Sequence, residues 1–167
     1  SGPFGVQLQV GRVDFYDMPA FGTTEVQMMN SYLTKDHIYK MDSLNVIHRA
    51  LYSDNFGYFG GEAFAANAFR NFPPLVGTDS VSSQSFISTL MNSSYQWAYG
   101  CGGGTFTSAG GLGSTTSFTG PVNAIFTMLF GSYFGDWNVT NTFLRAPLCA
   151  STPALTCCWA GRPNWFF

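Results

Sequence analysis

Cys101, the one cysteine set among glycines, is the first candidate for chemistry in this sequence. It follows an aromatic-rich stretch from Tyr95 to Tyr99 and lies between Gly100 and Gly102. In α/β proteins ligands gather where parallel strands end, and amides in a glycine turn can lower the pKa of a thiol. The chemistry expected of such a residue is attack by a thiolate on an electrophilic carbon. That reaction needs an adjacent base and donors for an oxyanion.

The sequence near Cys101 supplies no Lys, Arg or His that could act as this base. His37 is predicted to lie in the first long helix and His48 within the second strand, so neither is expected at the carboxyl end of a strand. Ser132 is a candidate hydroxyl nucleophile, but its Gly-Ser-Tyr-Phe-Gly surroundings differ from the Gly-x-Ser-x-Gly elbow. Cys101, Gly102 and Ser132 therefore mark a candidate catalytic region that lacks a visible base.

The glycine-rich stretch from Gly100 to Gly120 also fails as a phosphate-binding loop. It lacks the Gly-Lys-Ser/Thr ending of a P-loop, and we expect a flexible surface loop. Four acidic residues could offer oxygen ligands to a calcium ion. Their spacing in the sequence matches no compact calcium-binding loop, and they are Asp54, Glu62, Asp79 and Asp136. We therefore expect no cofactor and no metal ion.

The four cysteines do not have the spacing of a zinc site. Cys157 and Cys158 are adjacent, which is a poor geometry for a shared tetrahedral metal or a relaxed disulfide. Two alternatives stay open: buried free thiols, or a disulfide that joins Cys149 to Cys157 or Cys158.

Aromatic residues make up 17% of the chain, and several cluster at predicted turns or near the end of the sequence. Tyr133, Trp137 and Trp165 are of this kind, and such rings often form interfaces or carbohydrate-stacking surfaces. Asn92 and Asn138 begin Asn-x-Ser/Thr sequons, which carry glycans only in a eukaryotic secretory pathway. These residues indicate protein contacts, self-association or glycan binding.

Charge is scarce in this sequence. Charged residues make up only 10% of the 167 residues, and the net charge is -2. We therefore expect no nucleic acid and no anionic membrane surface as a partner. No apolar run approaches the roughly 20 residues of a transmembrane helix. The chain starts almost directly on a strand pattern and stops on aromatic residues, and we interpret it as a segment of a longer protein.

Strands and helices are predicted to alternate along the chain. The run from Ala124 to Phe130 has the length of a buried strand, and Thr24 with Gln27 forms a capping box at a helix start. The predicted strands span 6 to 13, 46 to 53, 95 to 99, 124 to 130 and 155 to 160. The predicted helices span 24 to 41, 60 to 72, 82 to 91 and 142 to 149.

Strands separated by helices imply right-handed crossovers and a mostly parallel sheet covered on both faces. The first helix places Val26, Met29 and Leu33 on one face. The expected fold class is therefore an α/β three-layer sandwich, in a single domain over residues 1–167.

The order of these elements resembles the catalytic domain of gingipain-type cysteine peptidases in the caspase-like clan. The resemblance rests on Val10-Gly11-Arg12-Val13 before a Tyr-containing helix, a strand ending in Ser53-Asp54-Asn55, a Tyr-Gly-x-Gly turn, and an apolar strand ending at Gly131. In that family one turn carries a His-Gly pair and the next carries the nucleophilic Cys. The match places Cys101-Gly102 on the His-Gly position and Ser132, Tyr133 or Phe134 on the nucleophile position.

The resemblance implies a caspase-like fold whose peptidase dyad has been lost. It also implies an extracellular or cell-surface location, because gingipain-like proteins are typically exported. The expected function is a structural or binding module. Two alternatives stay open: an active cysteine hydrolase that uses Cys101, and a self-assembling fibre or sheath subunit that carries glycans.

Overall fold

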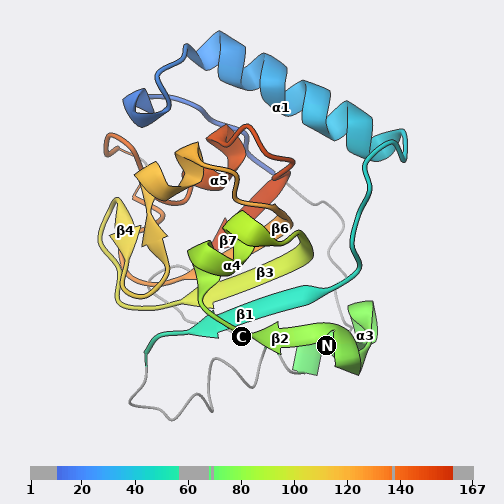
Figure 1. Ribbon diagram of the computed structural model, residues 1–167. Helices are drawn as coiled ribbons and strands as arrows, with labels where there is room; N and C mark the ends of the chain where they lie inside the picture. The colour runs from blue at the N-terminus through green and yellow to red at the C-terminus, as the bar shows by residue number, and fades with distance from the viewer. Residues whose placement is uncertain (1–10, 57–67, 69, 137, 160–167) are drawn as a thin grey trace, which may run out of the picture.

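The computed structural model describes residues 11–56, 68, 70–136 and 138–159. Its centre is a five-stranded sheet in the order β2-β1-β3-β6-β7, and all neighbouring strands run parallel (Figure 1). The strands are β1 (Ala50–Asp54), β2 (Val81–Ser83), β3 (Tyr95–Cys101), β6 (Ala124–Phe130) and β7 (Thr156–Trp159). A separate antiparallel pair consists of β4 (Ser108–Ala109) and β5 (Gly113–Ser114).

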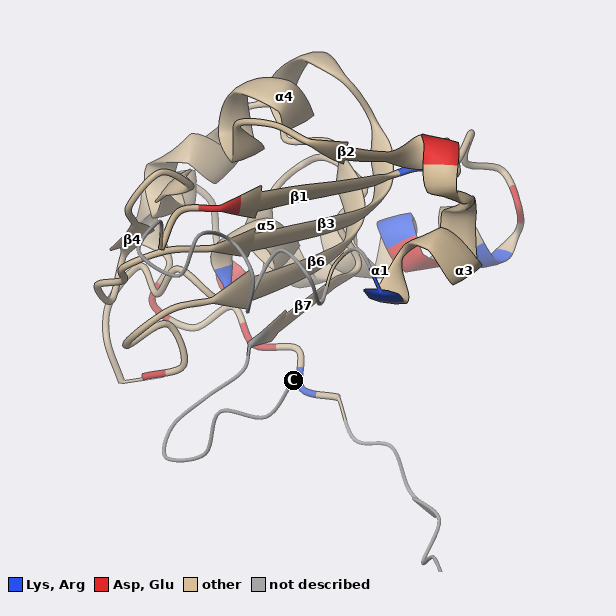
Figure 2. Cartoon of the chain, turned by 90° about the horizontal axis from the view of Figure 1, so that it is seen from below, with Lys and Arg blue, Asp and Glu red and all other residues tan. Residues whose placement is uncertain are grey.

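Helices lie on both faces of the sheet, which makes the fold an α/β three-layer sandwich. The α-helices with described bounds are α1 (Glu25–Lys40), α3 (Pro73–Val76), α4 (Phe86–Asn92) and α5 (Ala146–Cys149). Short 3-10 helices are η1 (Pro19–Phe21), η2 (Thr78–Ser80) and η3 (Thr115–Thr119). Figure 2 shows the five strands one below another in the order of the sheet, with α4 above them and α5 behind the sheet.

The two faces of the sheet pack against different helices because side chains alternate along each strand. Leu51, Ala98 and Leu129 point into one cluster, which also contains side chains from α1, α4 and α5. Ala50 and Tyr52 belong to a second cluster. Its other members come from the segment before and within α3 and from the neighbouring strands, namely Ala68, Phe72, Val76, Val81, Trp97, Tyr99 and Met128. Burial of each large apolar side chain contributes about 1.5–3 kcal/mol.

The start of α1 confirms the predicted capping box. The Gln27 amide donates to Thr24 Oγ1 at 3.2 Å, and the Thr24 amide donates to Gln27 Oε1 at 3.0 Å. The predicted apolar face is wrong, because Val26 is 70% exposed and Leu33 is 54% exposed. The helix buries Met28 and Lys35 instead.

Several predicted boundaries change in the structure. Residues 11–13 form no strand, and residues 6–10 lie outside the described part of the chain. The predicted helix at 60 to 72 also falls largely outside it, although Ala68, Arg70 and Asn71 are helical. The predicted helix at 82 to 91 begins only at Phe86, because residues 81–83 form β2 at the sheet edge. No helix in the described part is long and apolar enough to cross a membrane.

Candidate functional site

The carboxyl ends of β1 and β3 meet at the point where the strand order changes direction. The chain passes from β1 to β2 on one side and then returns to β3 on the other side of β1. In doubly wound sheets this switch point is where ligands bind. Asp54 ends β1, Cys101 ends β3, and the two residues are direct partners in the register of the sheet.

The Cys101 thiol is buried and bound as a donor. Cys101 is 0% exposed, and its Sγ donates to Asp54 Oδ1 at 3.2 Å. The Phe56 amide donates to the same oxygen at 3.1 Å. Burial, followed by the hydrogen bond to Asp54, raises the pKa of the Cys101 thiol to about 12. Because only the thiolate is a good nucleophile, this environment opposes attack by Cys101 at neutral pH.

Asn55 connects the end of β1 to the glycine-rich segment that follows β3 through hydrogen bonds and close packing. Its backbone amide donates to the Cys101 carbonyl at 2.8 Å, and its Nδ2 donates to Ser53 Oγ at 3.1 Å. Gly111 has φ +75, and a Cβ there would lie 2.8 Å from the Asn55 Cβ. Gly102 faces the same side chain, since its Cβ would lie 3.3 Å away. These glycines serve close packing, and the predicted flexible loop is an ordered segment that contains β4, β5 and η3.

The structure brings the Ser132 loop against the Cys101 loop. The Gly102 amide donates to the Phe130 carbonyl at 3.1 Å. A Cβ at Gly104 would collide with both the Ser132 carbonyl oxygen and the Phe134 ring, and a Cβ at Gly131 would lie 2.5 Å from the Gly102 carbonyl oxygen. The two positions that the resemblance assigns to a dyad are therefore on adjoining loops.

Phe134 fills the space between these two loops. Its side chain is 0% exposed, and its ring packs against Phe143 with centroids 5.1 Å apart. The same ring lies against Gly104 and Gly131, and a Cβ at either position would collide with it. The Phe134 side chain thus packs between the loop that follows β3 and the loop that follows β6.

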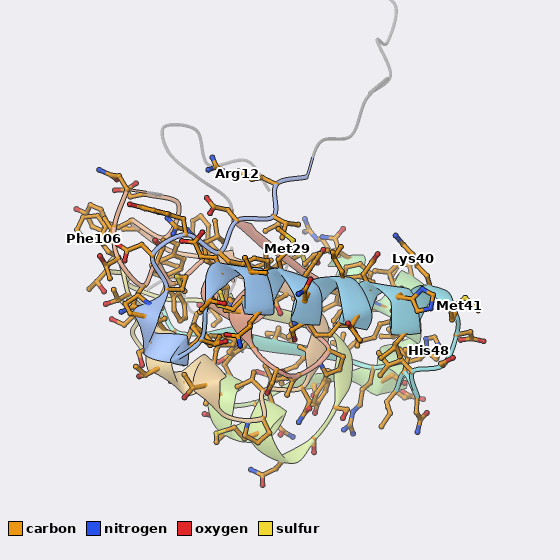
Figure 3. The ribbon with its side chains drawn as sticks, turned by 90° about the horizontal axis from the view of Figure 1, so that it is seen from above. Arg12, Met29, Lys40, Met41, His48 and Phe106 are labelled. Atoms are coloured by element: carbon orange, nitrogen blue, oxygen red, sulfur yellow. The ribbon has the colours of Figure 1, made fainter. Side chains whose placement is uncertain are left out.

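The histidines lie away from this edge. His48 Nδ1 is 3.0 Å from Gln96 Oε1, near the start of β3, and His37 is exposed in α1. Figure 3 shows His48 and Phe106 at opposite ends of the molecule. The prediction that His37 is helical is confirmed. The prediction that His48 lies within a strand is wrong, because β1 begins two residues later, at Ala50.

Two exposed aromatic residues lie close together at the carboxyl edge of the sheet. Tyr133 and Phe106 are each 41% exposed, and their rings meet edge to face with centroids 5.3 Å apart. Tyr133 has φ +70, a conformation that costs energy for a residue with a Cβ and recurs at functional sites. Sequence reasoning missed Phe106, whose only signal is a single aromatic within a polar segment. Trp137 and Trp165 lie outside the described residues.

The remaining predicted residues are distributed over the surface and the core. Asn92 ends α4, where its Nδ2 donates to the Ser88 carbonyl at 2.7 Å, and both Asn92 and Asn138 are exposed. All four cysteines are free, so the alternative of a disulfide from Cys149 is not realised in the structure. No cluster of three or more His, Cys, Asp or Glu side chains suited to a metal ion occurs in the described part of the chain.

Lys35 is a buried charged residue that sequence reasoning missed. Its Nζ donates to the carbonyls of Leu148 and Ala150 at 3.0 and 2.8 Å, at the end of α5. Burial lowers the pKa of Lys35 to about 8. Lys35 therefore satisfies terminal carbonyls of a short helix and holds α1 against it.

Comparison of the chain with protein-family models, curated proteins and solved structures finds no significant match.

Proposed function

We propose that this chain is a non-catalytic α/β module on a gingipain-like fold, exported to the cell surface or beyond, which works through contacts with protein partners, including further copies of itself. The parallel sheet supports the proposal, as do the adjoining loops at Cys101 and Ser132. The proposed location at the cell surface or beyond rests on the resemblance to gingipain-type peptidases, which are typically exported. A fibre or sheath subunit would be the assembled form of such a module.

The observation that carries the proposal is the hydrogen bond from Cys101 Sγ to Asp54 Oδ1. A peptidase thiol must lose its proton readily, whereas burial, together with the hydrogen bond to Asp54, raises the pKa of the Cys101 thiol to about 12. The buried Phe134 ring packs between the loops at Cys101 and Ser132. Both features favour packing over turnover, and they oppose the alternative of an active hydrolase that uses Cys101.

The contact surface that we propose is centred on Phe106 and Tyr133. Exposed aromatic rings are enriched in protein interfaces. Charge repulsion keeps many proteins monomeric, and this chain has a net charge of only -2. The edge-to-face contact of the two rings holds them in one arrangement before binding, which lowers the entropic cost of association.

Sedimentation velocity over a micromolar concentration series tests this proposal. We expect the wild-type chain to form higher-order species that weaken in Phe106→Ala and in Tyr133→Ala. Met91→Ala is the matched control, because Met91 on α4 exposes the same 41% of its surface. A monodisperse monomer at every concentration, or an equal effect of Met91→Ala, would overturn the proposed surface.

A further inference from the structure

A cavity lies where the first turns of α1 meet η1, the end of η3 and the end of α5. Its lining includes Phe21 of η1, Gln27 of α1 and Thr119 of η3, and Ser151 follows α5. The volume is about 260 Å³, slightly below the range of about 300–1,000 Å³ for sites of drug-sized ligands. The cavity therefore has room for one small molecule.

The lining of this cavity combines exposed polar residues with a buried floor. Gln27, Ser31 and Ser151 are exposed, whereas Met28 is 4% exposed and Cys149 is 9% exposed. Solvent therefore reaches the cavity, and a ligand can enter it without a change of the fold.

The capping box at the start of α1 fixes the side-chain amide of Gln27. Its Oε1 accepts from Thr23 Oγ1 at 2.7 Å and from the Thr24 amide at 3.0 Å. Its Nε2 carries two donors, and neither has an acceptor among the described residues. Gln27 thus lines the cavity with an amide that is already held in place and has both donors left for a ligand.

Hydroxyl groups supply the rest of the polar lining. No side-chain hydrogen bond joins Ser31 or Ser151 to another described residue. Thr119 Oγ1 donates to the Thr116 carbonyl at 2.8 Å and keeps its own lone pairs. Because a hydroxyl both donates and accepts, this set matches a ligand whose own groups do the same, as the hydroxyls of a sugar do.

The remaining lining favours a neutral ligand with an apolar face. No Asp, Glu, Lys, Arg or His occurs among the described residues that line the cavity. Phe21 is half-buried and offers an aromatic ring, whose electron-rich face suits the C–H groups of a sugar ring. We propose that this cavity binds one neutral sugar ring, with its hydroxyl groups on Gln27 Nε2 and the two serine hydroxyls and one C–H face against Phe21.

NMR titration of the whole chain with the methyl glycosides of glucose, galactose and mannose tests the site. We expect at least one glycoside to produce saturable shifts of the Gln27 side-chain amide and of the Ser31 and Ser151 backbone amides. Cyclohexanol, a ring of the same size with a single hydroxyl, should produce no saturable shift there.

The corresponding free hexoses are titrated in parallel. Binding of a glycoside indicates the end of a glycan chain as the ligand, and binding of free hexoses alone indicates a free sugar. Failure of all these sugars, or shifts that cyclohexanol reproduces, would overturn the proposal on the wild-type protein alone. The cavity shares no residue with the surface of Phe106 and Tyr133, so either proposal can fail alone.

Substitutions at exposed positions of α1 locate the bound sugar. Ser31→Phe places a ring in the cavity, and we expect it to abolish the saturable shifts. Asn30→Phe is the matched control, because Asn30 is exposed on the same helix and does not line the cavity. Ser31→Ala removes one hydroxyl and should weaken binding by about two- to tenfold. Unchanged affinity in Ser31→Phe would contradict the site.

Discussion

Cys101 Sγ donates a hydrogen bond to Asp54 Oδ1 over 3.2 Å and thereby joins the ends of β3 and β1. The bond requires the thiol to keep its proton. The same carboxylate that holds the thiol also turns the chain after β1, because it accepts from the Phe56 amide. The residue that looks most reactive in the sequence thus contributes to the packing of the sheet edge.

This contact makes stability depend on pH above neutrality. The pKa of Cys101 rises from 9.0 to about 12 on folding, chiefly through burial. The folded state keeps the proton where the unfolded state loses it, so the contribution of Cys101 is complete below pH 9 and falls as pH approaches 12. Relative to Cys101→Ala, wild type should lose about 2 kcal/mol of unfolding free energy by about pH 10.5. Urea unfolding of both proteins at two pH values measures this change, and a constant difference would contradict it.

Gly104 is predicted to be intolerant of any side chain. A Cβ there would collide with the Ser132 carbonyl oxygen, which is backbone, and with the buried Phe134 ring. We expect Gly104→Ala to lower the unfolding free energy by about 1–3 kcal/mol. Gly103→Ala is the matched control, because nothing lies within 4 Å of its Cβ position. Equal unfolding midpoints in urea for the two variants would show that the loops do not pack as described.

Lys35 should give the opposite pH dependence. Its pKa falls from 10.5 to about 8 on burial, so between these values the unfolded state binds more protons and stability rises with pH. Relative to Lys35→Met, wild type should gain about 2 kcal/mol between about pH 8 and pH 9.5. Thermal unfolding across this range measures the gain. Lys40→Met, on the exposed end of the same helix, is the control and should show no such trend.

The sequence predicted those elements whose signal is local. The strand at Ala124–Phe130 and the capping box at Thr24 are confirmed. Each has a signal confined to a few consecutive residues, which is a continuous apolar run for the strand and a pair of capping side chains for the helix. The strand β2 was missed because its three residues, Val-Ser-Ser, carry almost no apolar pattern. The strand β3 extends two residues beyond the prediction, through Gly100 and Cys101, because both pair with neighbouring strands.

The site was predictable in position but not in its contacts. Glycines around Cys101 placed it correctly at the carboxyl edge of the sheet. Its partner Asp54 is 47 residues away in sequence, and no local pattern links the two. The burial of Phe134 depends likewise on Gly104, which is far away in the sequence, as well as on the nearby Gly131. Lys35 points inward from α1 because its Nζ donates to carbonyls at the end of α5.

The central claim, that Cys101 is a buried and protonated thiol without catalytic reactivity, is tested most directly by iodoacetamide labelling of the native chain across pH with mass mapping of each cysteine. Cys158 is exposed and Cys101 is 0% exposed. We predict that Cys158 reacts first and that Cys101 stays unlabelled near neutral pH until urea unfolds the protein. Labelling of native Cys101 near neutral pH, as fast as that of Cys158 or faster, would contradict the account and favour a cysteine hydrolase.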